Sequence, residues 1–193
     1  MDPFSRMREA LGRAVLLPEE EWQVFQENLT LKHCNQGDTL ICEGQIENRL
    51  HFLSRGATRS FFFKDGKEIT VDFQFAGDFV TAYYSFITRK PSPITIEALT
   101  DTETVYIDYN ALQNFYRRFP LGERTGRLMA EYQYSKRLQR EMDLLSLTAE
   151  ERYKELLAKH PTLVRDISVK HLSSYLGIQP ESLSRIRKAL AGN

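Results

Sequence analysis

The sequence predicts an α+β protein in which a β-sandwich or barrel is followed by helices. From residue 30 to 108, turn signals built on glycine recur about every ten residues and separate short β-prone runs. After Asp108 the glycines become sparse and the residues follow helical spacing. A basic C-terminal segment contains two short amphipathic runs that meet at Gly177.

The composition is that of an ordinary globular protein. The chain has 193 residues, 41% of them hydrophobic, and zero formal net charge, which argues against a disordered or generally basic nucleic-acid-binding protein. Because no apolar run reaches the roughly 18 residues of a membrane helix, no membrane partner is expected. Two cysteines are too few for a disulfide framework, and we expect a cytoplasmic protein.

The charges are unevenly distributed along the chain. Residues 1–118 carry four more acidic than basic side chains, whereas residues 119–145 have one extra basic residue and residues 146–193 have three. A basic end within a neutral chain is typical of a nucleic-acid-binding portion, although a difference this small also fits chance.

Within the β-rich part, the strongest local pattern is a hairpin. Asp65-Gly66 lies between the β-prone runs 58–63 and 69–73, and this arrangement favours a tight turn between two antiparallel strands. Residues 95–99 and 104–107 are expected to form another strand pair.

The residues after Asp108 predict two helices. A short helix over 111–119 ends at Pro120, and a long helix follows over 121–145. Its 3/4-spaced positions are only partly apolar, so the pattern fits equally a helix packed on its own domain and a dimerisation helix. These positions are Leu121, Thr125, Leu128, Tyr132, Ser135, Gln139 and Met142.

Residues 168–190 predict a helix-turn-helix. Ser168 is a good N-cap, and Leu172 and Leu176 give the first helix an apolar face. Gly177 stands where a left-handed residue ends that helix, and Pro180 suits the first position of the second.

The polar face of the second helix carries candidate DNA contacts. Arg185 can donate two hydrogen bonds to a guanine, while Glu181 can accept from cytosine N4 and also hold the Arg185 guanidinium. Ser182 lies on the same face and is the third candidate base contact. The alternative is a solvated face of a helical appendage. The candidate phosphate contacts are Ser168, Lys170, Gln179, Arg187 and Lys188.

The order of these parts resembles the CRP/FNR family of bacterial transcription regulators over nearly the whole chain. In the C-terminal part the resemblance rests on Leu176-Gly177 and the run 181–186. In the β-rich part it rests on Asn35-Gln36-Gly37-Asp38, Cys42-Glu43-Gly44 and the runs 50–56, 64–68 and 75–79.

The resemblance implies three parts. Residues 1–118 would form a double-stranded β-helix of the jelly-roll type, similar to a cyclic-nucleotide-binding domain and acting as a sensor. Residues 119–145 would form the dimerisation helix, with Leu121, Leu128, Tyr132 and Met142 as dimer residues. Residues 146–193 would form a winged helix-turn-helix DNA-binding domain, with the wing around 163–167.

The implied function is that of a homodimeric transcription regulator and not of an enzyme. Its expected partners are double-stranded DNA with a palindromic promoter site, a second copy of the chain and, as a further candidate, RNA polymerase. The alternative is a signalling module that responds to a cyclic nucleotide or another small ligand without sequence-specific DNA binding. A metal-dependent cupin-like enzyme is not expected, because the chain lacks a His-x-His pair.

The cyclic-phosphate cassette of the cAMP-binding relatives is degenerate here. They carry a Gly-Glu pair and an Arg-Ser pair, where an ungapped count places Thr81-Ala82 and Ser92-Pro93. A buried phosphate needs a fixed cation and oriented donors, and proline has no N–H to donate. We therefore expect no response to cAMP, unless a shifted loop brings in Arg89 or Lys90.

Aromatic residues occupy the segment where the ligand would bind. Tyr83, Tyr84 and Phe86 are expected to fill the vacated pocket as core, and the alternative is an apolar ligand held through hydroxyl groups. The candidate pocket residues are Phe79, Ala82, Tyr83, Tyr84, Ser92 and Tyr132.

No cofactor or metal is predicted. An iron–sulfur cluster needs four cysteine ligands, and the chain has only Cys34 and Cys42, which are expected to be buried thiols or a redox pair. With His33 and His51 they do not match zinc spacing. Haem ligation by either histidine stays open.

Overall fold

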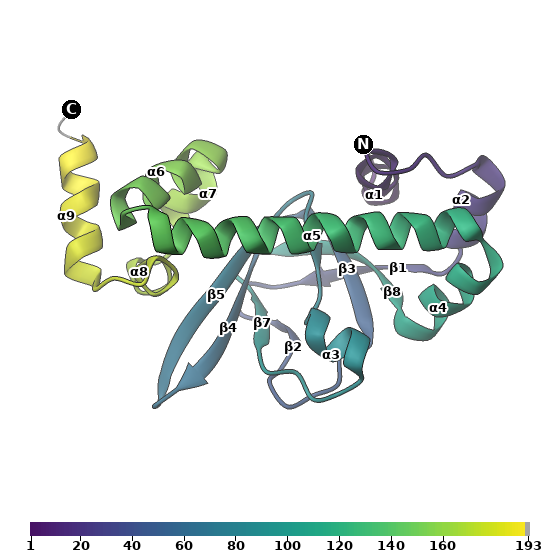
Figure 1. The fold of residues 1–193 in the computed structure, drawn as a ribbon, viewed down its shortest axis with the longest axis horizontal. Helices are drawn as coiled ribbons and strands as arrows, with labels where there is room; N and C mark the ends of the chain where they lie inside the picture. Colours follow the sequence, from purple (N-terminus) through teal and green to yellow (C-terminus); the bar gives the residue numbers. More distant parts are fainter. Residues whose placement is uncertain (192–193) are drawn as a thin grey trace. The chain divides into compact units, whose positions relative to one another are not determined.

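The computed structural model describes residues 1–191, and at positions 162, 163, 165 and 191 it describes the backbone only (Figure 1). The helices are α1 (Pro3–Gly12), α2 (Glu19–Gln26), α3 (Tyr83–Thr88), α4 (Tyr109–Arg118), α5 (Pro120–Ser146), α6 (Ala149–Lys159), α7 (Pro161–Asp166), α8 (Val169–Leu176) and α9 (Pro180–Ala191). The strands are β1 (Leu29–Cys34), β2 (Thr39–Ile41), β3 (Arg49–Arg55), β4 (Ala57–Lys64), β5 (Lys67–Phe75), β6 (Phe79–Val80), β7 (Thr95–Ala98) and β8 (Thr102–Asp108).

The predicted fold class is confirmed as a β-rich domain followed by helices. Two compact units divide the chain: residues 1–60 with 73–134, and residues 61–72 with the chain from 135 onward. We call them the β-unit and the helical unit. Helix α5 and strands β4 and β5 each contribute residues to both units.

The strands form two four-stranded sheets, and neither closes on itself. Their orders are β1-β8-β3-β6 and β2-β7-β4-β5. Strand β8 is central in the first sheet and is antiparallel to both neighbours, so that Val105 lies opposite Leu31 on β1 and Phe52 on β3. Large aromatic residues, among them Trp22 and Phe115, complete the core beside this sheet.

The predicted hairpin is confirmed, whereas the second predicted strand pair is wrong. Strands β4 and β5 are neighbours and flank Asp65-Gly66. Strands β7 and β8 form as predicted, but β7 pairs with β2 and β4 while β8 lies in the other sheet. The connection through residues 99–101 therefore crosses between sheets, and strand propensity alone does not distinguish this from a hairpin.

Two glycines allow α5 to pack closely on α4. A Cβ at Gly122 would overlap the Phe115 ring, and a Cβ at Gly126 would overlap the Tyr116 hydroxyl. Pro120 begins α5 directly after α4 and the extended residue Phe119. The break at Pro120 therefore produces the two predicted helices, with bounds that differ from the prediction by one or two residues.

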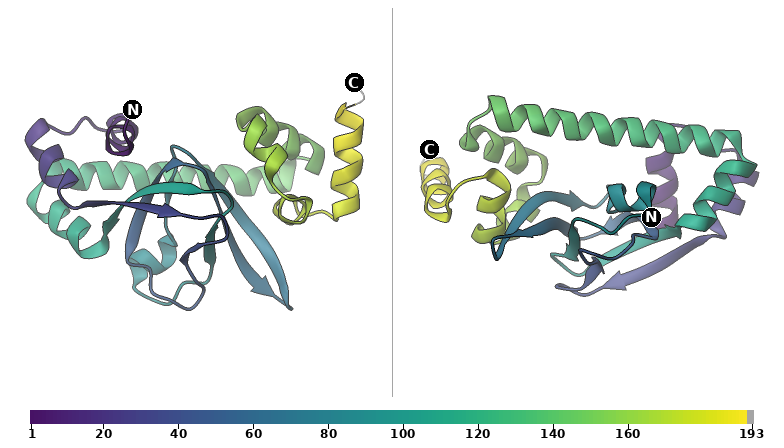
Figure 2. Two further views of the ribbon diagram at one scale, coloured as in Figure 1. Left: turned by 180° about the vertical axis from the view of Figure 1, so that it is seen from behind. Right: turned by 60° about the horizontal axis from the view of Figure 1, so that its bottom comes forward.

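Up to residue 191, where the described part ends, the helical unit has helices α6, α7, α8 and α9 after α5, and they can be followed in Figure 2. Thr148 and Glu151 form a reciprocal capping box that begins α6. Val164 on α7, Leu172 on α8 and Leu183 on α9 are fully buried, and α6 contacts both α7 and α8, while α8 contacts α9. The wing expected around 163–167 is not formed, because α7 covers positions 163–166 and every regular element described after Ser146 is a helix.

Candidate DNA-binding and ligand sites

The helix-turn-helix forms as the residue types predict. The Ser168 hydroxyl accepts from the His171 N–H at 3.2 Å and caps α8. Gly177 ends α8 in the left-handed region, with φ 69° and ψ 30°, and α9 begins at Pro180. The predicted apolar faces meet, because Leu172, Leu176 and Leu183 are fully buried.

The candidate base contacts lie together on α9. Glu181 and Arg185 are exposed, and Ser182 is partly exposed. The Arg185 guanidinium lies 3.3 Å from the Ser182 hydroxyl and 3.5 Å from the Glu181 carbonyl oxygen. The sequence suggested that the Glu181 carboxylate holds this arginine, whereas the contacts given by the structure are to a hydroxyl and a main-chain oxygen.

The candidate phosphate contacts fall into two groups. Ser168, Gln179 and Lys188 are exposed, and Lys170 is exposed but paired with Glu68 at 3.2 Å. Arg187 is different, because its guanidinium donates to the Val164 carbonyl at 3.3 Å and lies over the Tyr153 ring. This arginine packs the helices together, and we leave it out of the proposed DNA contacts.

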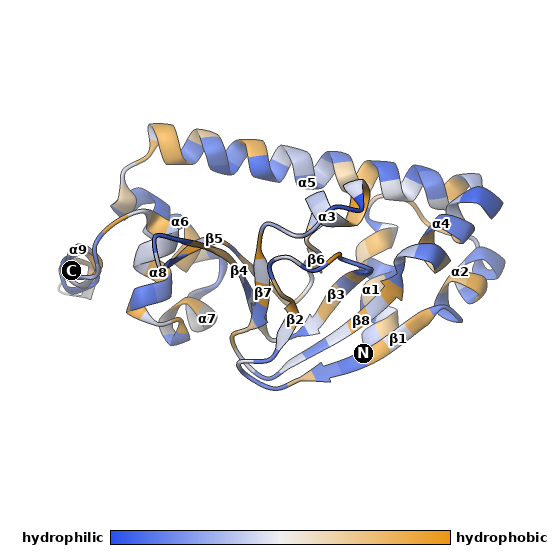
Figure 3. Ribbon diagram, turned by 90° about the horizontal axis from the view of Figure 1, so that it is seen from below, coloured by the Kyte–Doolittle hydropathy of each residue, from blue (hydrophilic) through white to orange (hydrophobic). Residues whose placement is uncertain are grey.

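The predicted 3/4-spaced positions of α5 are buried or partly buried near its start and exposed further along. Leu121 packs against the core of the β-unit, and Thr125 is buried. In the C-terminal half, Leu138, Met142 and Leu145 are 45%, 55% and 85% exposed, and their spacing of four and three places them on one face. Figure 3 shows apolar residues recurring among the polar ones of α5. The predicted dimer residues Tyr132 and Met142 are exposed.

A buried carboxylate that the sequence did not point to lies against the segment expected to bind a ligand. Glu47 is 4% exposed, and its carboxylate oxygens accept from the Arg49 N–H at 2.9 Å and the Ala82 N–H at 3.3 Å. Burial raises the pKa of Glu47 above its ordinary value, although the amide donors partly oppose this shift. The amide of Ala82, which the ungapped count places at the cassette glutamate, thus already has an acceptor within the chain.

The other cassette positions also have partners within the chain. Thr81 donates to the Arg49 carbonyl, and the Ser92 hydroxyl donates to the Ile94 carbonyl at 2.7 Å. Arg89, the candidate replacement cation, donates to the Glu47 carbonyl and stacks over the Tyr109 ring at 4.1 Å. The Arg89 guanidinium is therefore already bonded within the chain.

The expectation that all three aromatic residues fill the vacated pocket is wrong for two of them. Phe86 is buried and packs edge-on against Tyr109. Tyr83 and Tyr84 are 48% and 51% exposed, because α3 turns this side outward while Phe86 turns in. Of the other candidate pocket residues, Ala82 and Ser92 are buried, Phe79 is partly buried beside Phe52, and Tyr132 is exposed.

A second buried titratable group lies on β3. His51 is 1% exposed, and its Nδ1 lies 3.2 Å from the Thr104 hydroxyl. Burial, with the nearby charges of Lys32 and Arg49, lowers the pKa of His51 to about 3. The imidazole is therefore neutral in the folded protein. Among the described residues no cluster of three metal-ligating side chains occurs, and no helix has the length and hydropathy needed to cross a membrane.

The comparisons with known proteins agree with this geometry. Residues 31–119 match the cyclic nucleotide-binding domain family. The match runs from within β1 to Phe119, the residue before α5, and confirms the predicted type of the β-rich domain. No curated protein sequence matches the chain.

Solved structures show the same fold over most of the chain. FixK2 from Bradyrhizobium japonicum is 21% identical, with 85% of each chain covered and a TM-score of 0.71. The c-di-GMP-responsive global regulator CLP of Xanthomonas campestris is 19% identical, with 91% of this chain and 92% of CLP covered and a TM-score of 0.65. The catabolite activator protein of Thermus thermophilus is 23% identical, with 95% and 87% covered and a TM-score of 0.56.

Proposed function

We propose that this chain is a homodimeric, DNA-binding transcription regulator whose DNA binding does not respond to cAMP. The observation that carries the proposal is the helix-turn-helix, in which Gly177 and Pro180 set the turn and α9 presents Arg185 to solvent. A helix of this kind fits the major groove and meets base edges with its N-terminal half. The fold shared with CLP and the catabolite activator protein supports the proposal.

The proposed roles divide between specificity and positioning. Arg185 binds a guanine edge, with Glu181 and Ser182 beside it on the same exposed face. Ser168, Lys170, Gln179 and Lys188 contact phosphates and set the orientation of α9 on the duplex. Since these are few contacts per subunit, the dependence of affinity on salt should be modest.

Replacing Arg185 with alanine tests the recognition face. We expect Arg185→Ala to weaken binding to the preferred site by roughly ten- to a hundredfold, since a bidentate contact to guanine contributes about 1–3 kcal/mol. Binding to unrelated DNA should change much less. The measurement is a fluorescence-anisotropy titration of duplexes selected by the wild-type protein.

The control for this experiment is Arg13→Ala, which removes an exposed arginine from the region that follows α1. It changes the net charge equally and should leave the affinity unchanged. An Arg185→Ala protein that keeps the wild-type affinity and sequence preference would show that α9 does not recognise DNA through this residue.

The absence of a cAMP response follows from the contacts of Glu47. The N–H of Ala82 is already bonded to the buried Glu47 carboxylate, and Ser92 and Pro93 supply no arginine where the cAMP-binding relatives hold the cyclic phosphate. We expect millimolar cAMP to leave the melting temperature unchanged, because a ligand stabilises a protein only by binding its folded state. A saturable rise in melting temperature with cAMP would contradict this account of the site.

A further inference from the structure

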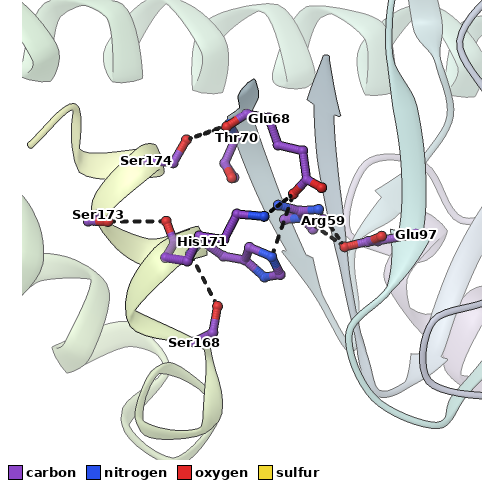
Figure 4. A network of polar contacts seen from close by, with 9 residues as sticks. Arg59, Glu68, Thr70, Glu97, Ser168, His171, Ser173 and Ser174 are labelled. Atoms are coloured by element: carbon purple, nitrogen blue, oxygen red, sulfur yellow. Dashed lines mark hydrogen bonds and ion pairs between the residues drawn. The ribbon is translucent and has the colours of Figure 1, made fainter. Parts of the chain in front are cut away.

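The β4–β5 hairpin contacts the first helix of the helix-turn-helix through polar groups that the proposed function does not explain. Glu68 lies 3.2 Å from the Lys170 ammonium and 3.8 Å from the His171 ring. The Ser174 hydroxyl accepts from the Thr70 N–H at 2.9 Å and donates to the Glu68 carbonyl at 3.2 Å. Figure 4 shows Glu68 and Thr70 on the hairpin facing His171 and Ser174 on α8. All five residues belong to the helical unit.

The groups that hold Glu68 are of the kind that hold a DNA phosphate. Lys170 and His171 lie in the first turn of α8, where the helix dipole and a lysine favour an anion. Lys170 is also a proposed phosphate contact. The Glu68 carboxylate is an anion with two acceptor oxygens. It can therefore accept from the Lys170 ammonium in the same way as a DNA phosphate.

We propose that Glu68 competes within the chain for Lys170, so that the hairpin holds DNA affinity down and releases α8 when DNA binds. This inference rests on the proposed DNA-binding function and adds a regulatory contact to it. We call the contact of Glu68 and Thr70 with Lys170, His171 and Ser174 the hairpin latch.

The hairpin that carries the latch is covalently continuous with the β-unit, so it connects that unit with the helix-turn-helix. Strands β4 and β5 pass from the latch into the β-unit at residues 60 and 73. Whatever displaces these two strands therefore also changes the position of Glu68. The contacts that make up this route lie in the hairpin and α8, so it does not require a cyclic nucleotide.

The strength of the latch suits a contact that opens. The Lys170 side chain is 68% exposed and that of Glu68 24% exposed, so water and salt screen the ion pair. The two hydrogen bonds of Ser174 fix the position of α8 against the hairpin backbone. Duplex DNA, with its dense row of phosphates, can displace a single carboxylate of this kind.

The first test is DNA affinity at several salt concentrations. We expect Glu68→Gln to bind DNA several-fold more tightly than wild type. Its plot of log affinity against log salt should be steeper, because in wild type salt also weakens the Glu68–Lys170 ion pair that competes with DNA. In a Lys170→Met background, Glu68→Gln should no longer raise the affinity.

The matched control is Glu43→Gln, which removes an exposed carboxylate of the β-unit with the same change in net charge. It should leave the affinity and the salt slope unchanged. Equal effects of Glu43→Gln and Glu68→Gln would overturn the latch, because overall charge would then explain both.

Hydrogen exchange at the Thr70 amide follows the contact directly, since this N–H donates to Ser174. DNA should accelerate exchange at Thr70 while slowing exchange in α9, and Ser174→Ala should accelerate it without DNA. If DNA binds and Thr70 remains protected, with Glu68→Gln unchanged in affinity, the latch is wrong and the proposed function stands. If neither wild type nor Glu68→Gln binds any duplex, the proposed function fails and the latch fails with it.

Discussion

Replacing His51 with glutamine should make the fold less sensitive to acid. The pKa of His51 is about 3 in the folded protein and about 6.5 in an unfolded chain, because burial and the nearby Lys32 and Arg49 disfavour the charged ring. Below pH 6.5 the unfolded chain binds a proton that the folded protein does not. The stability from this group is therefore complete above pH 6.5 and is lost as pH falls toward 3, by about 1.4 kcal/mol per pH unit.

The measurement is the free energy of unfolding in urea at pH 7, 6 and 5. His51→Gln keeps a polar group near the Thr104 hydroxyl but does not titrate, so its stability should fall less steeply than that of wild type. The control is His33→Gln, which replaces a histidine whose side chain is 66% exposed and should retain the wild-type slope. Parallel curves for His51→Gln and wild type would show that the buried ring does not resist protonation.

Placing a charge on the exposed apolar face of α5 should separate the proposed dimer. Leu138, Met142 and Leu145 lie on one face, and a second copy of α5 would bury them. Leu138→Glu would bring one carboxylate from each subunit into that interface. The apolar contacts of two helices do not offset the desolvation and repulsion of these charges. We expect a monomer that binds a duplex with two half-sites at least roughly a hundredfold more weakly than the wild-type dimer does. The reason is that no second subunit is held in place to bind the second half-site.

Sedimentation equilibrium and titration of whole and half sites measure this effect. The affinity for a single half-site should be unchanged, because α9 is not altered. Leu16→Glu, at an exposed leucine that precedes α2, is the control and should remain dimeric with full affinity. A Leu138→Glu protein that stays dimeric would place the subunit contact elsewhere.

The sequence predicted the elements that depend on neighbouring residues. The Asp65-Gly66 turn, the Ser168 cap and the left-handed Gly177 form because their chemistry acts within a few residues. The dimer pattern was less clear, because the 3/4-spaced positions of α5 combine a core-facing residue, Leu121, with outward ones such as Met142.

Contacts between residues far apart in the sequence could not be predicted from local patterns. Glu47 is 35 positions from Ala82, and Glu68 is 102 positions from Lys170. No periodicity or turn motif connects such pairs, because the tertiary fold brings them together. The exposure of Tyr83 and Tyr84 also depends on the tertiary fold, because the path of the chain around α3 decides which aromatic side chain is buried.

Selection of genomic DNA fragments bound by the purified protein, with and without cAMP, tests the central claim most directly. We predict enrichment of a palindromic motif whose half-sites lie about 10 base pairs or a multiple of this apart, centre to centre, as two copies of α9 require. The same motif should be enriched equally in both conditions. No enrichment, or enrichment that depends on cAMP, would contradict the proposal.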